Sequence, residues 1–398
     1  MFPKSGCWHS MRDLAQASRR RFKVELFDGA DLDAVAWPSL DAGPELLMYV
    51  YQSREFLEIW METVGKGRRA RCFLVIIKDA YNRPILYLPL AIETRLNSRI
   101  LRFMDGGVVD FNAPILSAAT ALGREEFTAV WSEICALLPA FDFIDLQKIA
   151  IEVCGQRNPL TYLDCHTYRS SGHAVALSDR TMPATASAIR MRKKLERQRQ
   201  RLTELGPVRF INGSTAARRP AVIDRLTALK REQYLRTSGR DFFASPGIHE
   251  FYARMASPEL VDRISDLSAL FCGDEIVSAH LGFRGRGRFY YVLPAFDTRY
   301  RPFAVGLLLL DHLVEHCAEE QYAIFDLGEG DADYKSKWAT HRLPLLTCEQ
   351  AMTPVGAMFG QLRRVRHLTA VEQLYGLCAG GLTGSAAATA RHRPARIA

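Results

Sequence analysis

Hydrophobic and polar residues recur along this chain with two periods, one typical of helices and one typical of strands. In the first part of the chain a helical spacing is followed by β-rich runs, and the turn cluster at 79–83 separates the first two of these runs. A second helical spacing and one more apolar run complete the order. We therefore predict a helix at Leu46–Val64, strands at Arg71–Lys78, Pro84–Glu93 and Ile100–Met104, a helix at Glu125–Leu138 and a strand at Phe141–Gln147.

The second part of the chain repeats this order loosely. Gly273-Asp274 and residues 285–287 supply turns between antiparallel strands. Two units of similar order favour a duplication and predict an α+β fold in which mixed sheets are flanked by helices. The predicted elements are helices at Pro220–Arg236 and Ile248–Met255, strands at Leu267–Cys272, Glu275–Phe283 and Arg288–Leu293, a helix from Gly306 to about Glu320 and a strand at Ala323–Leu327.

We predict four segments along the chain. Residues 1–44 are expected to form a leader, and residues 45–170 and 171–350 to form the two α+β halves. Residues 351–398 are expected to be a C-terminal helix and a disordered tail, because the composition is small and polar from about Cys378 onward.

The second half begins with a basic helix at 187–205. Seven basic residues lie between 190 and 201 against the single acid Glu196. One interpretation is an electrostatic footprint for RNA or another polyanion. The other is a solvated face whose apolar stripe packs on the body, and we favour it because no RNA-recognition motif accompanies the segment. The stripe consists of Ala188, Met191, Leu195, Leu202 and Leu205.

Composition limits the class of protein. With 398 residues and 48% hydrophobic residues, the chain is long enough for two globular units with a substantial core. The net charge of +8 favours anionic partners such as nucleotide phosphates, RNA or an acidic membrane surface, although many basic proteins bind none of these.

The nine cysteines form no CxxC pair, which argues against a zinc ribbon or a disulfide scaffold. Because the chain has neither an N-terminal h-region nor an apolar run of about 20 residues, we expect no transmembrane segment and a cytoplasmic location.

Candidate chemistry is concentrated in Arg288–Trp338. An Arg-rich loop there leads into a predicted helix, whose free backbone N–H groups and positive dipole end suit a phosphate. A glycine at the start of the helix allows close approach of a ligand, and the arginines can pair with diphosphate oxygens. The alternative is an ordinary loop-to-helix connection. The donor-site candidates are Arg299, Arg301, Val305, Gly306 and Leu307.

The acidic loop FDLGEGDADYKSKW follows the next predicted strand. Carboxylates and a tyrosine in one pocket can deprotonate an amine nucleophile and donate a proton to a leaving thiolate. The alternative is a surface turn whose charges are solvated. His280 is a further candidate base, although a histidine on a strand is more often an interior residue. The catalytic candidates are Glu329, Asp331, Tyr334, Lys335 and His280.

One metal-like motif lies within the same region. His312–His316 reads HLVEH and matches the H-x-x-E-H zinc-protease pattern, with both histidines on one helical face. The helix also carries a packing stripe that includes Leu309, Leu313 and Cys317. Since five-residue matches arise easily by chance, we expect no metal.

Together these segments resemble a known family, the GNAT-superfamily acetyltransferase domain of the CelD/BcsL cellulose-biosynthesis proteins, also called BioF-like. The resemblance rests on Leu267–Trp338, on the basic segment RMRKKLERQRQRLTELGPVRF and on the polar motif Asp110-Phe111-Asn112-Ala113-Pro114. It covers residues 45–345 in outline and is strongest at 265–340. It implies two tandem GNAT-like (acyl-CoA N-acyltransferase) domains, as in the related Fem-type transferases.

The resemblance also implies an activity. An acyl group would pass from acetyl-CoA or another acyl-CoA co-substrate, without a metal, to an amine or hydroxyl of a small molecule or of a saccharide such as a polysaccharide precursor. One departure is that Val305-Gly306 stands where the family often has Pro-Gly, and the fuller Gly-rich diphosphate loop is absent. This leaves open a Fem-like transferase that uses aminoacyl-tRNA, and a third possibility is a non-catalytic polysaccharide-assembly protein. The oligomeric state is not indicated.

By resemblance, Gly306 and its flanks form the donor site, and Glu329, Asp331, Tyr334 and Lys335 form the catalytic region. We expect Glu329 or Asp331 to act as general base and Tyr334 as proton donor. The acceptor is expected to bind in the cleft between the halves, near Asp110, Asn112, Arg240 and Phe242.

Overall fold

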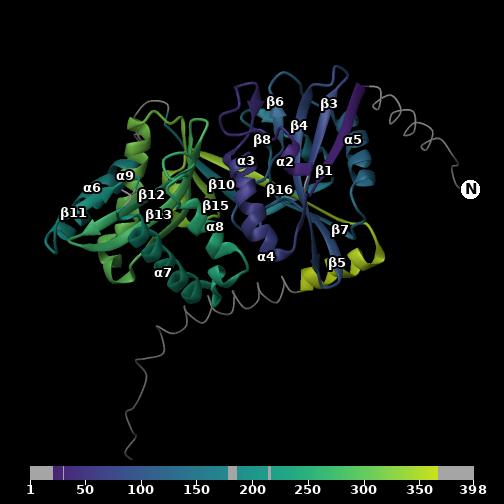
Figure 1. The fold of residues 1–398 in the computed structure, drawn as a ribbon. Helices are drawn as coiled ribbons and strands as arrows, with labels where there is room; N and C mark the ends of the chain where they lie inside the picture. Colours follow the sequence, from purple (N-terminus) through teal and green to yellow (C-terminus); the bar gives the residue numbers. More distant parts are fainter. Residues whose placement is uncertain (1–20, 30, 178–185, 214–216, 366–398) are drawn as a thin grey trace, which may run out of the picture.

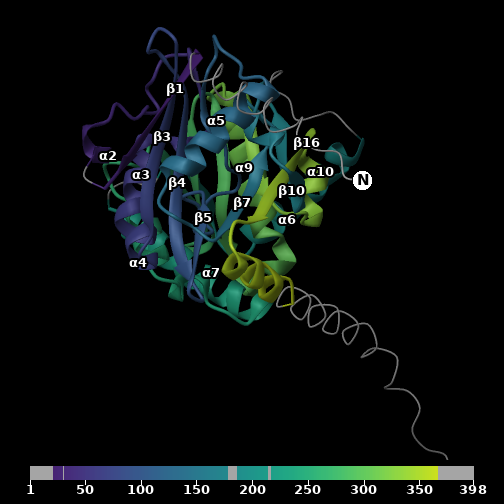
Figure 2. The same cartoon turned by 90° about the vertical axis from the view of Figure 1, so that its right-hand side faces the viewer.

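The computed structural model describes residues 21–29, 31–177, 186–213 and 217–365 (Figure 1). Its main feature is one continuous mixed β-sheet that runs through both halves and is flanked by helices (Figures 1 and 2). The predicted α+β fold of two similar units is therefore confirmed.

The N-terminal half of the sheet is antiparallel except for its last pair of strands. β3 (Arg71–Asp79) and β4 (Pro84–Arg95) form a hairpin, and β1 (Phe22–Asp28) pairs with β3. β5 (Ser98–Arg102) is antiparallel to β4 and parallel to β7 (Phe143–Ala150). β3 and β4 are buried along most of their length because both faces of the sheet are covered. β1 lies within residues 1–44, for which only a leader was expected.

The C-terminal half of the sheet follows the same plan. β11 (Val208–Ile211), β12 (Ser265–Cys272), β13 (Glu275–Gly285) and β14 (Arg288–Phe296) are antiparallel in this order. β14 is parallel to its other neighbour, β15 (Ile324–Glu329). The four strands predicted in this half are confirmed, and their ends differ from the predicted ends by at most three residues.

Two strands that the sequence did not predict join the halves. β10 (Cys165–Ala176) follows the N-terminal half in the chain but pairs with β15, and β16 (His341–Ala351) follows the C-terminal half but pairs with β7. β10 and β16 also pair with each other. The resulting order is β1-β3-β4-β5-β7-β16-β10-β15-β14-β13-β12-β11, so each half has the same strand order and the same single parallel pair.

Helices cover this sheet largely as predicted. α5 (Arg124–Leu137), α7 (Arg219–Ser238), α8 (Ile248–Met255) and α9 (Val305–Glu319) occupy the predicted positions, and α7 and α9 contact β13 and β14. Besides the basic helix, the other described helical segments are α2 (Asp31–Ala34), η1 (Val50–Gln52), α3 (Arg54–Trp60), η2 (Met61–Gly65), α4 (Lys66–Arg68), η3 (Pro159–Tyr162), η4 (Phe242–Ala244), η5 (Thr298–Phe303), α10 (Asp333–Trp338) and residues 354–365.

The prediction of one helix over Leu46–Val64 was wrong at its start. Leu46–Leu47 form β2 and pair with β6 (Ile115–Ser117), and the helix begins only after Ser53. The Ser53 hydroxyl accepts a hydrogen bond from the Phe56 backbone N–H, which is the usual role of a serine at a helix N-cap. The cap residue therefore marks the boundary that the apolar spacing alone did not show.

An aromatic cluster packs the two halves into one body. Phe56 of α3 contacts Phe283 of β13 and Phe251 of α8, with ring centroids 5.3 Å apart in both cases. Tyr51 packs edge-on against Tyr290 at 5.3 Å and is fully buried. Because these rings come from both halves, the halves share one hydrophobic core and are not two separately packed domains.

The basic helix is α6 (Ala186–Thr203). Leu195 and Leu202 are buried against the body and Met191 is half-buried, which confirms that the apolar stripe is a packing face. Leu205 follows the helix and is exposed. Within the described residues, no helix combines the length and the hydrophobicity needed to cross a membrane.

Candidate functional site

A pocket opens in the C-terminal half where β14 and β15 separate. The last residue pair of their parallel ladder is Tyr290 with Asp326. Immediately beyond it, Tyr291 and Leu327 line a cavity of about 680 Å³ between the two strands. Residues of the Arg-rich loop, of the start of α9 and of the acidic loop complete the walls, so the two predicted motifs meet here.

The start of α9 forms one wall. The residue before the helix, Ala304, has a left-handed backbone (φ 53°), which is uncommon for alanine and turns the chain sharply into α9. Gly306 and Leu307 line the pocket, whereas Val305 is fully buried in the core. A Cβ at residue 306 would lie 3.0 Å from Phe296 Cδ1. The glycine is therefore explained by packing against β14 as well as by room for a ligand.

The two arginines of the preceding loop have different positions. Arg301 lines the pocket, is exposed and has no ion-pair partner among the described residues. Arg299 is bound instead to Asp297 (2.8 Å) and Glu275 (3.0 Å) and does not line the pocket. The structure thus brings Arg301, and not Arg299, to the predicted donor site.

The opposite wall carries three of the predicted catalytic residues. Glu329 ends β15, and its carboxylate accepts a hydrogen bond from the Ser170 hydroxyl of β10. Lys335 is buried, its Nζ donates to the Glu329 carbonyl oxygen at 2.6 Å, and burial lowers its pKa. Burial raises the pKa of Tyr334 to about 12, so its hydroxyl keeps its proton at neutral pH.

The other two catalytic candidates lie outside the pocket. Asp331 is half exposed and lies 3.0 Å from His173 Nε2, and this hydrogen bond lowers its pKa. His280 is fully buried in β13, and its ring stacks on Tyr291 with centroids 4.5 Å apart. Burial lowers the pKa of His280 to about 3, and neither ring nitrogen has a hydrogen-bond partner within the described part of the chain. His280 is therefore placed as a neutral core residue.

Asp110 reaches the pocket from the N-terminal half. Its Oδ2 accepts from the Tyr51 hydroxyl at 2.9 Å, and its Oδ1 accepts from the Glu329 backbone N–H at 3.2 Å. The carboxylate lies so close to residue 328 that a Cβ on Gly328 would come within 2.6 Å of it. Burial raises the pKa of Asp110 to about 6, although Lys335 opposes the shift. A carboxylate that exchanges a proton near neutral pH is suited to general base catalysis.

Lys230 of α7 is a site residue that the sequence reasoning missed. Its side chain is buried and lines the pocket, and its Nζ donates to the Pro294 carbonyl oxygen at 3.0 Å. Burial lowers its pKa to about 8, with repulsion from Lys335 acting in the same direction. The sequence does contain a pattern that indicates this position. Lys230 follows the buried Leu226 by four residues, so it lies on the apolar face of its helix.

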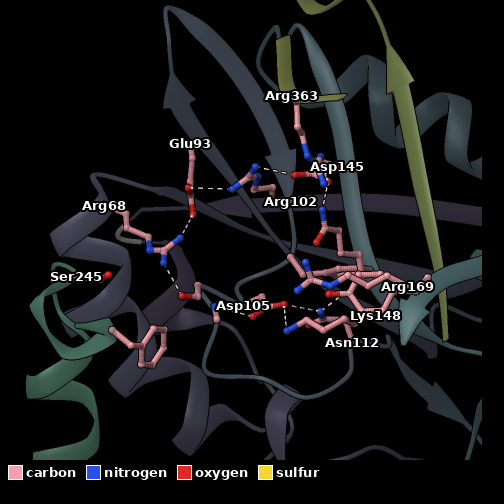
Figure 3. A pocket seen from close by; sticks show the side chains of 16 residues that line it. Arg68, Glu93, Arg102, Asp105, Asn112, Asp145, Lys148, Arg169, Ser245 and Arg363 are labelled. Carbon is pink, nitrogen blue, oxygen red and sulfur yellow. Dashed lines mark hydrogen bonds and ion pairs between the residues drawn. The ribbon is translucent and has the colours of Figure 1, made fainter. Parts of the chain in front are cut away.

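The predicted acceptor residues do not form one site. Asp110 lines the pocket between β14 and β15, whereas Asn112 and Phe242 line a second cavity in the N-terminal half (Figure 3). Arg240 is exposed and lines neither cavity.

The HLVEH motif lies on the face of α9 that contacts β11 and α6. The His312 ring stacks on Phe210 with centroids 4.0 Å apart, and burial lowers its pKa. Within the described residues, no group of three or more His, Cys, Asp or Glu side chains is arranged to hold a metal ion.

A family comparison agrees with this geometry. Residues 190–336 match the family model described as "Acetyltransferase (GNAT) domain". The matched segment runs from α6 to α10 and contains both walls of the pocket. The C-terminal half is therefore similar to GNAT-type acetyltransferase domains. No curated protein matches the chain in sequence.

Solved structures are similar over most of the chain. FemX has a TM-score of 0.53 at 10% identity, covering 85% of this chain and 99% of FemX. The C-terminal domain of a putative lysylphosphatidylglycerol synthetase from Agrobacterium fabrum has a TM-score of 0.48 at 12% identity, covering 77% and 94% of the two chains. A tandem GNAT protein from the clavulanic acid biosynthesis pathway has a TM-score of 0.45 at 9% identity, covering 83% and 99%. The fold is that of two GNAT-like domains in tandem.

Proposed function

We propose that the chain is an acyltransferase that uses acetyl-CoA or another acyl-CoA as donor. The observation that supports this most directly is the pocket between β14 and β15. It combines an apolar wall at the start of α9 with a half-buried carboxylate, Asp110, whose pKa is raised to about 6. Arg301 at the mouth of the pocket is free to meet the diphosphate of the donor.

In the proposed reaction Asp110 is the general base. It takes a proton from the acceptor's amine or hydroxyl, whose nitrogen or oxygen then attacks the thioester carbonyl carbon. The carbon–sulfur bond breaks, and the thiolate takes a proton from the Tyr334 hydroxyl, which is protonated at neutral pH. Glu329, held by Ser170, orients the acceptor, and its backbone N–H positions Asp110. Relative to the sequence prediction, the role of base moves from Glu329 or Asp331 to Asp110.

The acceptor is proposed to be a small molecule or a saccharide. The CelD/BcsL resemblance supports an amine or hydroxyl of a polysaccharide precursor, and a role in cellulose or exopolysaccharide biosynthesis in the cytoplasm. In this proposal the acceptor approaches from the side of the pocket formed by Asp110, Glu329 and Lys335.

Calorimetry and a thiol-release assay test this proposal. The chain should bind acetyl-CoA or a longer acyl-CoA and release free CoA in the presence of an amine or saccharide acceptor. Asp110→Asn should lower turnover at least a hundredfold and abolish the rise in rate with pH near 6, because it removes the base. Asp331→Asn is the matched control, since Asp331 does not line the pocket and is bound to His173, and it should keep wild-type turnover.

Two results would contradict the proposal. One is the absence of binding for every acyl-CoA tested. The other is equal turnover for Asp110→Asn and wild type, which would exclude Asp110 as base even if the donor binds.

The second candidate function is a Fem-like transfer from aminoacyl-tRNA. It is favoured by the exposed cations of α6, of which Arg190, Lys194 and Arg197 have no ion-pair partner among the described residues. Copurifying RNA, with an affinity that falls steeply with salt and weakens in an Arg190→Gln, Lys194→Gln, Arg197→Gln variant, would favour this function. A non-catalytic assembly role would be favoured if no donor of either kind were consumed.

A further inference from the structure

A second cavity lies in the N-terminal half at the place equivalent to the pocket just described. β5 and β7 form the parallel pair of this half, and the last residue pair of their ladder is Leu101 with Ile144. Immediately beyond it, Arg102 and Asp145 line a cavity of about 490 Å³ (Figure 3). The same opening between parallel strands therefore occurs twice in the molecule.

The lining of the second cavity differs from that of the first, because charged side chains from several elements converge on it (Figure 3). They come from α4, β4, β5, β7, β10, the loop after β5 and the helix at 354–365. The basic side chains are Arg68, Arg102, Lys148, Arg169 and Arg363, and the acidic ones are Glu93, Asp105 and Asp145.

All three carboxylates are already paired with cations of the same cavity. Asp145 lies 2.6 Å from Arg102 and 2.5 Å from Arg363. Asp105 lies 2.7 Å from Lys148. Glu93, which is almost fully buried, lies 3.7 Å from Arg68 and 3.6 Å from Arg102. Since five cations face three anions, the cavity keeps an excess of positive charge.

The floor of the cavity is held by hydrogen bonds. Lys148 is buried and has a left-handed backbone (φ 54°), and its Nζ also donates to the Val109 carbonyl oxygen. The buried Asn112 amide donates to Asp105 Oδ2 at 3.1 Å and to the Gln147 carbonyl oxygen at 3.0 Å. A non-glycine residue in this conformation persists only where its surroundings fix it, so the floor is held in place before any ligand arrives.

Arg169 is the cation of the cavity that forms no ion pair among the described residues, and its guanidinium lies 5.4 Å from the centroid of the Tyr168 ring. The pairing of β10 with β16 is irregular between Thr167 and Ser171, and such a bulge changes the direction of side chains. As a result both Tyr168 and Arg169, which are neighbours in the chain, line the cavity. Arg169 has no ion pair within the described residues, and the buried Nε–H of Arg102 has no hydrogen-bond partner there either.

We propose that this cavity is a second binding site, which takes a small molecule through a phosphate or carboxylate group. Arg169 supplies the uncompensated charge, and Arg102 and Lys148 fix the geometry around the anion. Phe103, Tyr168 and Phe242 provide apolar walls for the rest of the ligand. The site is separate from the acyltransferase pocket and does not depend on that proposed function.

Calorimetry on the whole chain tests the site with defined probes. Inorganic phosphate, glucose 1-phosphate and glucuronate are the anionic probes, and glucose is the neutral control. At least one of the anions should bind, with an affinity that falls as salt is added, and glucose should bind much more weakly. Comparing glucose 1-phosphate with glucuronate tells whether the site takes phosphate or carboxylate.

Variants locate the binding in this cavity. Arg169→Gln should weaken binding of the anion about tenfold or more, and Arg169→Lys should restore part of it, because a charged hydrogen-bond donor is returned. Arg240→Gln is the matched control, since Arg240 is a nearby exposed arginine that lines neither cavity, and it should bind as wild type. Acetyl-CoA binding should be the same in all four proteins.

Four outcomes would overturn the site. They are no binding by any of the anions, equal binding by wild type and Arg169→Gln, equal binding of glucose and glucose 1-phosphate, and competitive displacement of the anion by acetyl-CoA. The last outcome would assign the anion to the pocket between β14 and β15.

Discussion

At the scale of single residues, burial decides which titratable groups can take part in chemistry. Asp110 and Lys230 both line the pocket. Partial removal from water shifts their pKa values toward neutrality, to about 6 for Asp110 and about 8 for Lys230. His280 is buried without contact with the pocket, and its pKa falls to about 3. The sequence offered His280 only as a further candidate base beside Glu329 and Asp331, and its surroundings make it a poor base, whereas those of Asp110 favour that role.

A His280→Leu variant tests this assignment. Unfolding exposes the histidine, whose pKa then returns to about 6.5, so the folded protein loses stability as the pH falls below that value. The variant lacks the histidine and should not lose stability in this way. Between pH 6.5 and pH 4, its free energy of unfolding should rise relative to that of wild type by up to about 1.4 kcal/mol for each unit by which the pH is lowered. Its turnover should be close to that of wild type. Denaturant unfolding at several pH values and the thiol-release assay measure both effects.

The exposed His166 provides the control for this variant. His166→Leu makes the same change at an exposed position, and its turnover should be close to that of wild type. A large loss of turnover in His280→Leu, with folding intact, would restore His280 as a catalytic candidate.

At the scale of elements, the spacing of apolar residues correctly predicted the helices that bury one face. α8 is found at the predicted residues, and α9 begins within one residue of its predicted start. β10 and β16 escaped prediction for physical reasons. β10 begins with polar residues that are largely exposed and contains Gly172, and β16 contains Pro344, which is unusual in a central strand. Their place in the sheet is set by partners far away in the chain.

The η5 turn before α9 offers a test of the donor wall. Arg301→Gln should weaken acyl-CoA binding about tenfold, because a charged contact with the diphosphate is lost. Arg299→Gln is the matched control two residues away, where the side chain is occupied by Asp297 and Glu275, and it should leave donor affinity unchanged. Calorimetry with acetyl-CoA and with CoA measures both variants. Equal effects of the two substitutions would place the diphosphate elsewhere.

At the scale of the whole molecule, two similar halves share one sheet and one core. The sequence predicted two similar halves because each has its own sequence of helices and strands. It predicted the candidate site only in part, since the contacts that build the pocket join distant residues, such as Asp110 with Glu329 and Lys230 with Pro294. No local pattern shows these pairs. The sequence predicted one acceptor cleft between the halves, whereas the structure has two separate cavities. This difference also depends on contacts between residues far apart in the chain.

A chain ending at Thr340 tests how far the halves depend on each other. Without β16, both β7 and β10 lose a neighbour, and the buried Leu345 and Cys348 leave the core. The shortened chain should lose cooperative melting and aggregate through its open strand edges. Circular dichroism measures the melting and light scattering measures the aggregation. Adding a peptide of residues 341–351 should partly restore cooperative melting and reduce aggregation. Melting like that of the full chain would show that the halves are independent.

The position of β16 also has a consequence for synthesis on the ribosome. β16 follows every other strand of the sheet in the chain, so the N-terminal half emerges first, and the edge of β7 that later pairs with β16 stays open until the C-terminal half has been made. We expect the nascent chain to be a client for chaperones that cover strand edges during this interval. The final step of folding is then the pairing of β10 with β16, which completes both halves in one event.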